Sequence, residues 1–227
     1  MTSVGGTQLQ FGWRWNPQSD VAFNADGSFN SAYFQSTPNA SATNVVWNES
    51  WLPAATGGGP SAIYPLPSWQ SGVQSVIGGD HRGTPDVSWN AAVNGAVLVD
   101  LQSFLAPADQ GVYLIGGTSA ASPQVAALTA LANERRKAMV KAPLGNVGEK
   151  LYSIGSGAFV DVAPVHQGAA GVISGNLDSN RLFDYNGDGN AVTVGPVPGW
   201  PTLAGWDLTT GFGTPSAPTY VGELAAS

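Results

Sequence analysis

The sequence predicts an α/β fold, and two features of one central stretch predict it. The short apolar run from Val112 to Ile115 is typical of a buried strand. Gly116 and Gly117 then allow the backbone to turn sharply. The segment 125–132 is small and apolar on nearly every side, so a helix there belongs inside a domain. We therefore expect a buried strand, a tight turn and a buried helix, with Pro123 in the first helical turn.

Other stretches predict the remaining elements. A strand is expected at 96–99, a shorter helix at 145–154, and irregular backbone at the three glycines 57–59. The charged run 134–137 should be the solvated end of the central helix, where cations favour the helix dipole. Asp86 comes just before a further strand. We expect it to be a buried structural carboxylate that accepts backbone N–H bonds, rather than a catalytic group.

Composition restricts the class of protein. The 227 residues suffice for one domain with a substantial core, and a hydrophobic content of 43% indicates a globular chain. Only 10% of residues are charged and the net charge is −7, which argues against nucleic acid and anionic membranes as partners. No apolar run is long enough to span a membrane, and the absence of cysteine excludes disulfides. Few ionisable groups suit an acidic medium, because acid denaturation acts mainly through such groups.

Ser119 is the candidate nucleophile, and its position has two interpretations. It lies at the expected start of a helix, beside backbone N–H groups that have no partner within the helix. Those N–H groups can be capped by the serine side chain, which makes Ser119 an N-cap. They can also stabilise an oxyanion beside the serine. The small residues around it, Gly116 to Ala121, leave room for a substrate backbone.

The segment Gly-Thr-Ser-Ala-Ala-Ser-Pro at 117–123 resembles the nucleophile motif of two serine peptidase families, the subtilisins and the sedolisins (serine-carboxyl peptidases). Further segments are similar to sedolisins and follow the order of that family. They are Thr-Ser-Val-Gly-Gly-Thr at 2–7, Gly-Gly-Gly-Pro-Ser at 57–61, Pro-Leu-Pro-Ser-Trp-Gln at 65–70, Arg-Gly-Thr-Pro-Asp-Val at 82–87, Phe-Val-Asp-Val at 159–162 and the Gly-Trp-Asp segment at 205–215.

The resemblance implies that residues 1–227 form the C-terminal portion of a sedolisin catalytic domain, with insertions at 11–44 and 166–200. It implies a subtilisin-like parallel sheet flanked by helices, incomplete on its N-terminal side, and a strand of that sheet at 2–10. The implied function is endopeptidase activity at acidic pH through an acyl-enzyme on Ser119. The implied substrate is a polypeptide and the implied location is extracellular or periplasmic.

The resemblance also implies one bound Ca²⁺ ion. Its ligands would be the carboxylates of Asp161 and Asp207 and the backbone carbonyls of Val162, Leu203 and Gly205. This donor set is reasonable, because calcium takes six or more oxygen ligands, several of them carbonyls from flexible loops. Leu203 stands where the family usually has glycine. The loop 184–190 begins like an EF-hand, but position 195 is glycine where the pattern has glutamate, so an Asx-rich turn is expected there.

The sequence contains no visible general base for Ser119. Sedolisins use a Glu-x-x-x-Asp pair, and none of Glu49, Glu134, Glu149 and Glu223 is followed by aspartate four positions on. Subtilisins use a His-Gly-Thr segment, and neither His81 nor His166 lies in one. We therefore expect the isolated chain to be inactive, with the missing N-terminal part of the domain as its partner. The alternatives are a non-catalytic or partner-dependent calcium-stabilised module, and a subtilisin-type peptidase.

Overall fold

The structure is a computed structural model, and its description covers part of the chain. The described residues are 1–10, 13–15, 34–36, 43–49, 54–93, 96–102, 109–162, 164, 178–181, 183–185, 191–193 and 199–227. The proposed insertion segments 11–44 and 166–200 therefore lie mostly outside the described residues. His166 and most of the loop 184–190, the candidate second calcium loop, lie outside them as well.

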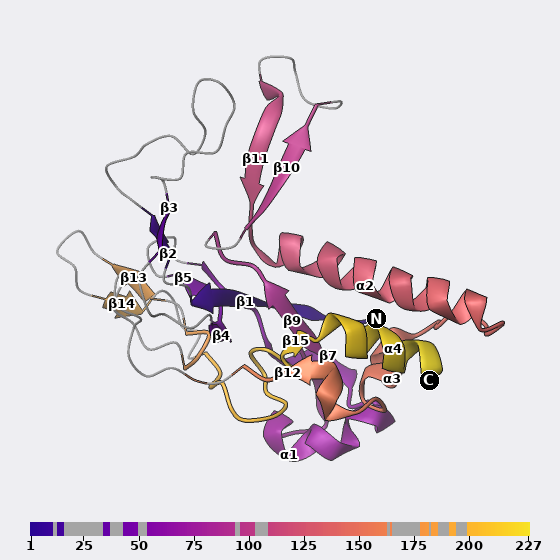
Figure 1. The fold of residues 1–227 in the computed structure, drawn as a ribbon. Coiled ribbons are helices and arrows are strands. Elements are labelled where there is room, and N and C mark those ends of the chain that lie inside the picture. The colour runs from indigo at the N-terminus through magenta and orange to yellow at the C-terminus, as the bar shows by residue number, and fades with distance from the viewer. Residues whose placement is uncertain are drawn as a thin grey trace.

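A mixed three-stranded sheet forms the centre of the molecule (Figure 1). Its strands are β1 (Val4–Gln10), β4 (Thr43–Val46) and β9 (Val87–Asn90), in the order β4-β1-β9. β1 runs parallel to β9, with Val4 opposite Val87, and antiparallel to β4. The parallel pair confirms the α/β class, and β1 confirms the strand predicted at 2–10.

Two helices cover one face of this sheet. α2 (Thr118–Ala138) packs on β1 and β9, and α4 (Ala217–Ala226) lies beside α2 (Figure 1). The main apolar core lies where these helices meet the sheet. Its buried members are Val87, Val125, Ala132, Leu144, Leu151, Ala158, Tyr220 and Leu224. The predicted second helix is present but shorter, as α3 (Val147–Leu151).

The strand before α2 is present, but its predicted burial is wrong. β10 (Val97–Leu101) and β11 (Gly111–Ile115) pair only with each other and form an antiparallel arm that projects from the body (Figure 1). Leu98 and Val112 are each 52% exposed. The apolar run predicted a strand correctly, but no described part of the chain packs over its exposed apolar side chains.

Irregular backbone was predicted at the glycines 57–59, and Gly57 and Gly58 lie outside any strand or helix, as expected. Gly59 differs, because it begins β7 (Gly59–Pro65), a strand paired antiparallel with β8 (His81–Thr84). The pairing is irregular between Pro60 and Pro65, as expected for a strand that holds two residues without N–H groups. A partner strand distant in sequence therefore orders this segment.

The remaining elements are short. They are β2 (Trp13–Trp15), β3 (Phe34–Ser36), β5 (Asn48–Glu49), β6 (Ala54–Ala55), a 3₁₀ turn (Ser68–Val73), α1 (Gln74–Ile77), a 3₁₀ turn (Ser156–Ala158), β12 (Phe159–Val160), β13 (Phe183–Tyr185), β14 (Ala191–Thr193) and β15 (Thr214–Pro215). β12 pairs with β15 and so joins the two segments expected to hold calcium.

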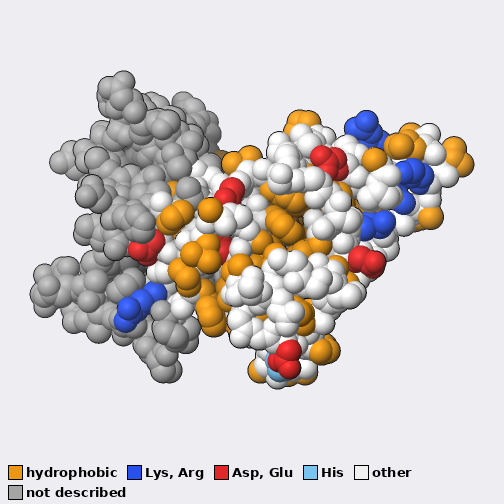
Figure 2. Space-filling view, turned by 90° about the horizontal axis from the view of Figure 1, so that it is seen from below, with side chains coloured by type: hydrophobic (Ala, Val, Ile, Leu, Met, Phe, Trp, Pro, Cys, Tyr) orange, Lys and Arg blue, Asp and Glu red, His pale blue; other side chains and the backbone are white. Residues whose placement is uncertain are grey.

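The charged end of α2 is only partly solvated. Glu134, Arg135 and Lys137 are exposed, but Arg136 is buried. Its guanidinium donates hydrogen bonds to the carbonyls of Leu224, Ala225 and Ser227 at the end of α4. On the face shown in Figure 2 charged side chains are sparse, and most of the basic ones lie at one end. Within the described ranges, no helix is both long and apolar enough to cross a bilayer.

Candidate active site

The turn between β11 and α2 is held from behind by the chain segment that follows β9. The Gly117 amide donates to the Ala91 carbonyl at 2.5 Å. A Cβ atom at Gly116 would lie 3.0 Å from the same carbonyl oxygen, so the two segments touch through their backbones. Gly117 has φ +76° and ψ 171°, a conformation that is open essentially to glycine alone.

Ser119 is the second residue of α2 and is exposed. Gly117 occupies the N-cap position, so the interpretation of Ser119 as an N-cap is wrong. Among the described residues, neither Thr118 nor Ser119 donates its amide N–H to an acceptor. The Ser119 hydroxyl therefore lies at the positive end of a 21-residue helix, next to free backbone donors.

Pro123 lies inside the helix rather than in its first turn, because α2 begins at Thr118. Proline has no N–H, so the Ser119 carbonyl lacks the donor that residue i+4 normally supplies. The helix is therefore less tightly bonded around Ser119 than in its middle.

No side chain in the described part of the molecule hydrogen bonds to the Ser119 hydroxyl. The exposed carboxylates Glu134 and Glu149 lie in the later turns of α2 and in α3. His81 begins β8 and pairs with Asp80 at 2.8 Å on the surface. Among the described residues, the candidate nucleophile Ser119 therefore has no base hydrogen bonded to it.

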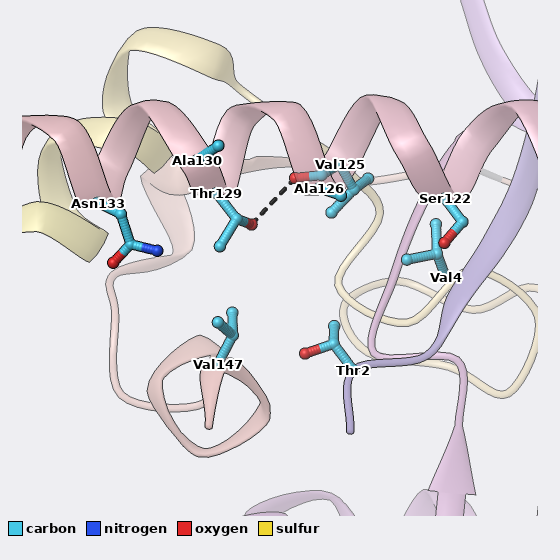
Figure 3. A pocket seen from close by; sticks show the side chains of 9 residues that line it. All are labelled: Thr2, Val4, Ser122, Val125, Ala126, Thr129, Ala130, Asn133 and Val147. Carbon is cyan, nitrogen blue, oxygen red and sulfur yellow. Dashed lines mark hydrogen bonds between the residues drawn. The ribbon is translucent and has the colours of Figure 1, made fainter. Parts of the chain in front are cut away.

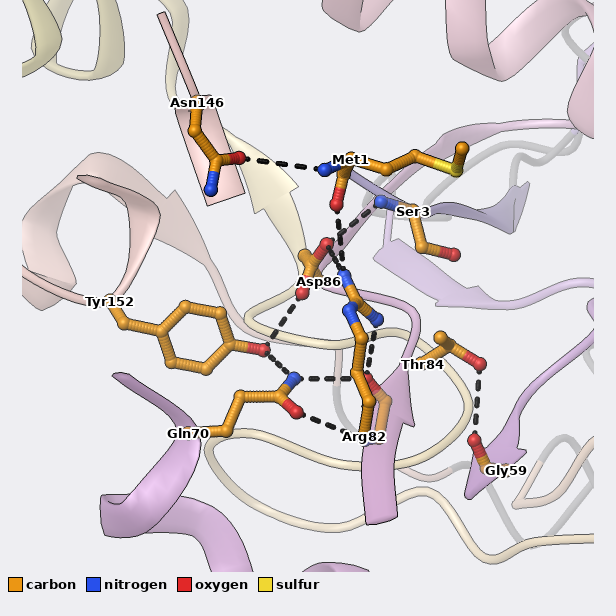
Figure 4. Close-up of polar contacts among 10 residues, drawn as sticks. Met1, Ser3, Gly59, Gln70, Arg82, Thr84, Asp86, Asn146 and Tyr152 are labelled. Carbon is orange, nitrogen blue, oxygen red and sulfur yellow. Dashed lines mark hydrogen bonds and ion pairs between the residues drawn. The ribbon is translucent and has the colours of Figure 1, made fainter. Parts of the chain in front are cut away.

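Asp86 has the structural role that was expected of it. Its side chain is fully buried. Oδ2 accepts the Ser3 amide at 2.8 Å and the Arg82 guanidinium at 2.6 Å, and Oδ1 accepts the Tyr152 hydroxyl at 2.9 Å (Figure 4). Burial first, and then the Asp86 charge, raise the pKa of Tyr152 well above its usual value. Gln70 donates to the Tyr152 oxygen from the other side.

A groove opens along α2 on the face that carries Ser122, which is one turn beyond Ser119 (Figure 3). It has a volume of about 310 Å³. Its lining is formed by Thr2, Val4, Ser122, Val125, Ala126, Thr129, Ala130, Asn133 and Val147. Leu131, which follows in the same helix, is 51% exposed. The prediction that α2 is buried on all sides is therefore wrong for the described residues.

Asp207 anchors the loop that was expected to bind calcium. Its carboxylate is fully buried. Oδ1 accepts the amide and hydroxyl of both Thr209 and Thr210, at 2.7–3.0 Å. Oδ2 accepts one bond, from the Leu203 amide at 2.8 Å, and so retains lone-pair capacity. The loop closes through paired backbone bonds between Asp207 and Gly211.

Asp161 lies beside the same loop. Its Oδ2 accepts the Gly205 amide at 2.8 Å, and its Oδ1 accepts the Val162 amide at 2.9 Å. The structure thus brings together the two segments named from the sequence. The carbonyl oxygens of Val162, Leu203 and Gly205 accept no hydrogen bond within the described part. No cluster of three or more His, Asp or Glu side chains occurs among the described residues, so a cation here would depend on those carbonyls.

The sequence analysis missed a buried acid close to the serine turn. Glu49 was considered only as a possible start of Glu-x-x-x-Asp, yet it is 5% exposed and contacts the segment behind Gly117. The available signal was its place two residues after a tryptophan in an apolar strand, which predicts an inward-facing side chain.

Comparison with known proteins gives consistent relatives, although no family model matches the chain. Over 179 residues it is 33% identical to kumamolisin from Bacillus sp. (strain MN-32), covering 75% of this chain and 26% of that protein. Over 165 residues it is 32% identical to a probable tripeptidyl-peptidase SED4 from Arthroderma benhamiae, covering 70% and 25%. The chain thus spans about a quarter of the length of these relatives.

Among solved structures, the fold is similar to a Pseudomonas sedolisin, a serine-carboxyl proteinase complexed with two molecules of pseudo-iodotyrostatin. The TM-score is 0.60 at 22% identity, over all of this chain and 46% of that chain. At this identity the likeness shows the fold. It agrees with the α/β class, and more than half of the solved relative has no counterpart in this chain.

Proposed function

Because this chain belongs to the sedolisin family of serine-carboxyl peptidases, we propose that it is the C-terminal portion of a catalytic domain that hydrolyses peptide bonds at acidic pH. One observation carries the proposal. Ser119 is exposed at the N-terminus of α2, beside amides without acceptors and with no capping role for its hydroxyl. Such a serine is free to react.

The chemistry follows the usual course of acyl transfer. The Ser119 oxygen attacks the peptide carbonyl, its proton passes to a base, and the carbonyl oxygen becomes an oxyanion. The free amides at the start of α2 would donate to that oxyanion. The amine then leaves with a proton, and water releases the acyl group. A base formed by two close carboxylates shares protons and works in acid, which sets the proposed pH range.

The base is proposed to come from an upstream part of the same domain. The groove along α2 supports this proposal, because it is apolar, begins one turn from Ser119 and is open in the described residues. The small side chains of Ser122, Ala126 and Ala130 would let another helix approach closely. A carboxylate carried on such a helix would lie near the nucleophile.

The experiment compares this chain with a form extended in frame by the coding sequence upstream of Met1. Hydrolysis of a denatured protein at acidic pH is expected from the extended form and not from the chain alone, and Ser119→Ala should abolish it. Turnover by the isolated chain that disappears in Ser119→Ala would contradict the proposed dependence on an upstream base. An active extended form that tolerates Ser119→Ala would contradict the nucleophile.

We also propose one Ca²⁺ ion at the Asp161–Asp207 loop. The Asp207 oxygen Oδ2, the Asp161 carboxylate and the free carbonyls of Val162, Leu203 and Gly205 would supply the ligands. These hard oxygen donors suit calcium, which would cross-link the two segments and would take no part in peptide cleavage. A ligand that binds the folded state at about 100 times its Kd adds about 2.7 kcal/mol of stability. Thermal unfolding with calcium and with chelator measures this gain.

Asp161→Asn should remove most of the calcium effect, whereas Asp100→Asn, which changes an exposed aspartate on the arm, should leave it intact. Equal stabilisation of both variants would argue against this site.

A second candidate function is a non-catalytic or partner-dependent module stabilised by calcium. The observation that favours it is the lack of any described side chain bonded to Ser119. A stop codon directly upstream of Met1, together with inactivity of the chain, would favour this candidate. In either case we propose a location outside the cytoplasm and a polypeptide as the bound molecule.

A further inference from the structure

Glu49 is a buried acid that the proposed reaction does not use. It ends β5, is 5% exposed, and has no cation partner among the described residues. A buried carboxylate without a cation is costly unless hydrogen bonds satisfy it. The hydrogen-bond partners of Glu49 therefore indicate the structural role of its side chain.

The Glu49 carboxylate connects two separate parts of the sheet region. Its Oε2 accepts the Trp47 indole N–H at 2.9 Å. Both oxygens accept the Val93 amide, each at 3.1 Å. Val93 lies just beyond β9, so the carboxylate fixes the course of the chain where it leaves the sheet.

The segment held by Glu49 is the one that supports the serine turn. Ala91, two residues before Val93, accepts the Gly117 amide, and Gly116 packs against the carbonyls of Ala91 and Ala92. A second route runs through Trp47, which shares a buried apolar cluster with Ala121, two residues after Ser119. Two routes thus lead from one carboxylate to the two sides of Ser119, and they meet in the cluster that Trp47 and Ala121 share with Ala91 and Ala92.

We propose that Glu49 is a positioning residue for the nucleophile: by holding the 91–93 segment and the Trp47 indole, it fixes the turn that presents Ser119. The bond to the Trp47 indole is buried and the bonds to the Val93 amide are partly buried, which suits a support that must hold a turn in place. The catalytic meaning of this role rests on the proposed function, but the support itself does not.

The support is tested by amide hydrogen exchange on this chain, without any catalysis. Glu49→Leu keeps the volume and removes both acceptors, whereas Glu49→Gln keeps one acceptor oxygen. Exchange at Val93 and Gly117 should be about tenfold faster in Glu49→Leu and less changed in Glu49→Gln. Exchange at Thr209 should not change, because its amide is bonded to Asp207 and, among the described residues, makes no bond to Glu49 or to the 91–93 segment. The matched control Glu149→Leu alters an exposed glutamate and should affect none of these amides.

Unchanged exchange at Gly117 in both Glu49 variants would overturn the proposal, as would uniform acceleration at all three amides. A side chain that only fills space predicts no local effect in Glu49→Leu. If Glu49→Leu fails to fold, Glu49→Gln alone decides through the contrast between Gly117 and Thr209.

The catalytic consequence is measured in the extended form of the protein. Glu49→Gln should lower kcat about tenfold and change KM by less than about twofold, because a displaced nucleophile affects the reaction more than binding. If that form shows no turnover, the proposed function fails while the exchange result still stands. An unchanged kcat together with faster Gly117 exchange would overturn the link from the turn to catalysis.

Discussion

The loop around Asp207 and the turn around Ser119 are built alike but completed differently. Each is a short polar segment with a glycine at positive φ, Gly211 in one and Gly117 in the other. The Asp207 carboxylate is buried and accepts five hydrogen bonds from its own loop. The Ser119 hydroxyl is exposed and has no described partner. We call the Asp207 loop the finished region, because its own residues satisfy the Asp207 carboxylate. We call the Ser119 turn the open region, because it is held only from behind and its hydroxyl is exposed among the described residues.

The largest effect is expected from substitution of Gly211, the glycine at positive φ in the finished region. A Cβ atom at Gly211 would lie 2.2 Å from the Asp86 carbonyl oxygen, and the backbone there has φ +62°. Clash and strain together should make Gly211→Ala less stable by about 4 kcal/mol. At Gly117 the nearest atom would be 3.8 Å away, so Gly117→Ala should cost only backbone strain, about 2 kcal/mol. Urea unfolding compares the two, and equal costs would contradict the distinction.

Asp207→Asn should destabilise the chain by about 3 kcal/mol even without calcium, because the buried side-chain amide cannot accept on both sides and would leave the Leu203 amide facing a donor. Asp161→Asn is the control. That side chain is exposed, so without calcium its replacement should cost less than about 1 kcal/mol. Chemical unfolding in chelator measures both. Similar losses would mean that the loop does not depend on Asp207.

Tyr152 tests the link between Asp86 and the finished region, since the Asp86 carbonyl also accepts the Phe212 amide. Tyr152→Phe leaves Asp86 and Gln70 each short of one partner and should cost about 1.5 kcal/mol at neutral pH. Burial and the Asp86 charge raise the pKa of Tyr152, and burial raises the pKa of Tyr220, so the folded state favours the neutral phenols.

Their contribution to stability is complete below the unfolded-state pKa near 10 and is lost as pH rises above it. Each tyrosine should contribute a slope of about 1.4 kcal/mol per pH unit in that alkaline range. Tyr152→Phe should therefore reduce the alkaline loss of stability relative to the unchanged protein. Parallel pH profiles would show that Tyr152 ionises equally well in both states.

The same contrast explains what the sequence could predict. The burial of Asp86 and the position of Ser119 at a strand–helix turn follow from local motifs, and the structure has them. The approach of Asp161 to the Asp207 loop was expected only from the resemblance to sedolisins, and the Asp161 carboxylate accepts the Gly205 amide of that loop. The exposure of Leu98 and Leu131 could not be predicted. An apolar pattern indicates that a segment has an apolar face, but it does not show whether another part of the chain packs on that face.

Long-range contacts explain the other errors. β7 is ordered by β8, and Arg136 is buried because α4 ends beside it, so neither result depends on neighbouring residues in sequence. Glu49 acts on a segment 44 residues away, which no local pattern reveals.

The smallest expected effect lies at the open region. Ser119→Ala removes a hydroxyl that is exposed and has no described partner, so stability should change by less than about 0.5 kcal/mol. Loss of an N-cap would instead cost about 1 kcal/mol. Urea unfolding of this variant beside the unchanged protein provides the measurement. A loss of about 1 kcal/mol in Ser119→Ala would give the hydroxyl a structural role. A negligible loss of stability would favour a role of the hydroxyl in reactivity over a role in structure.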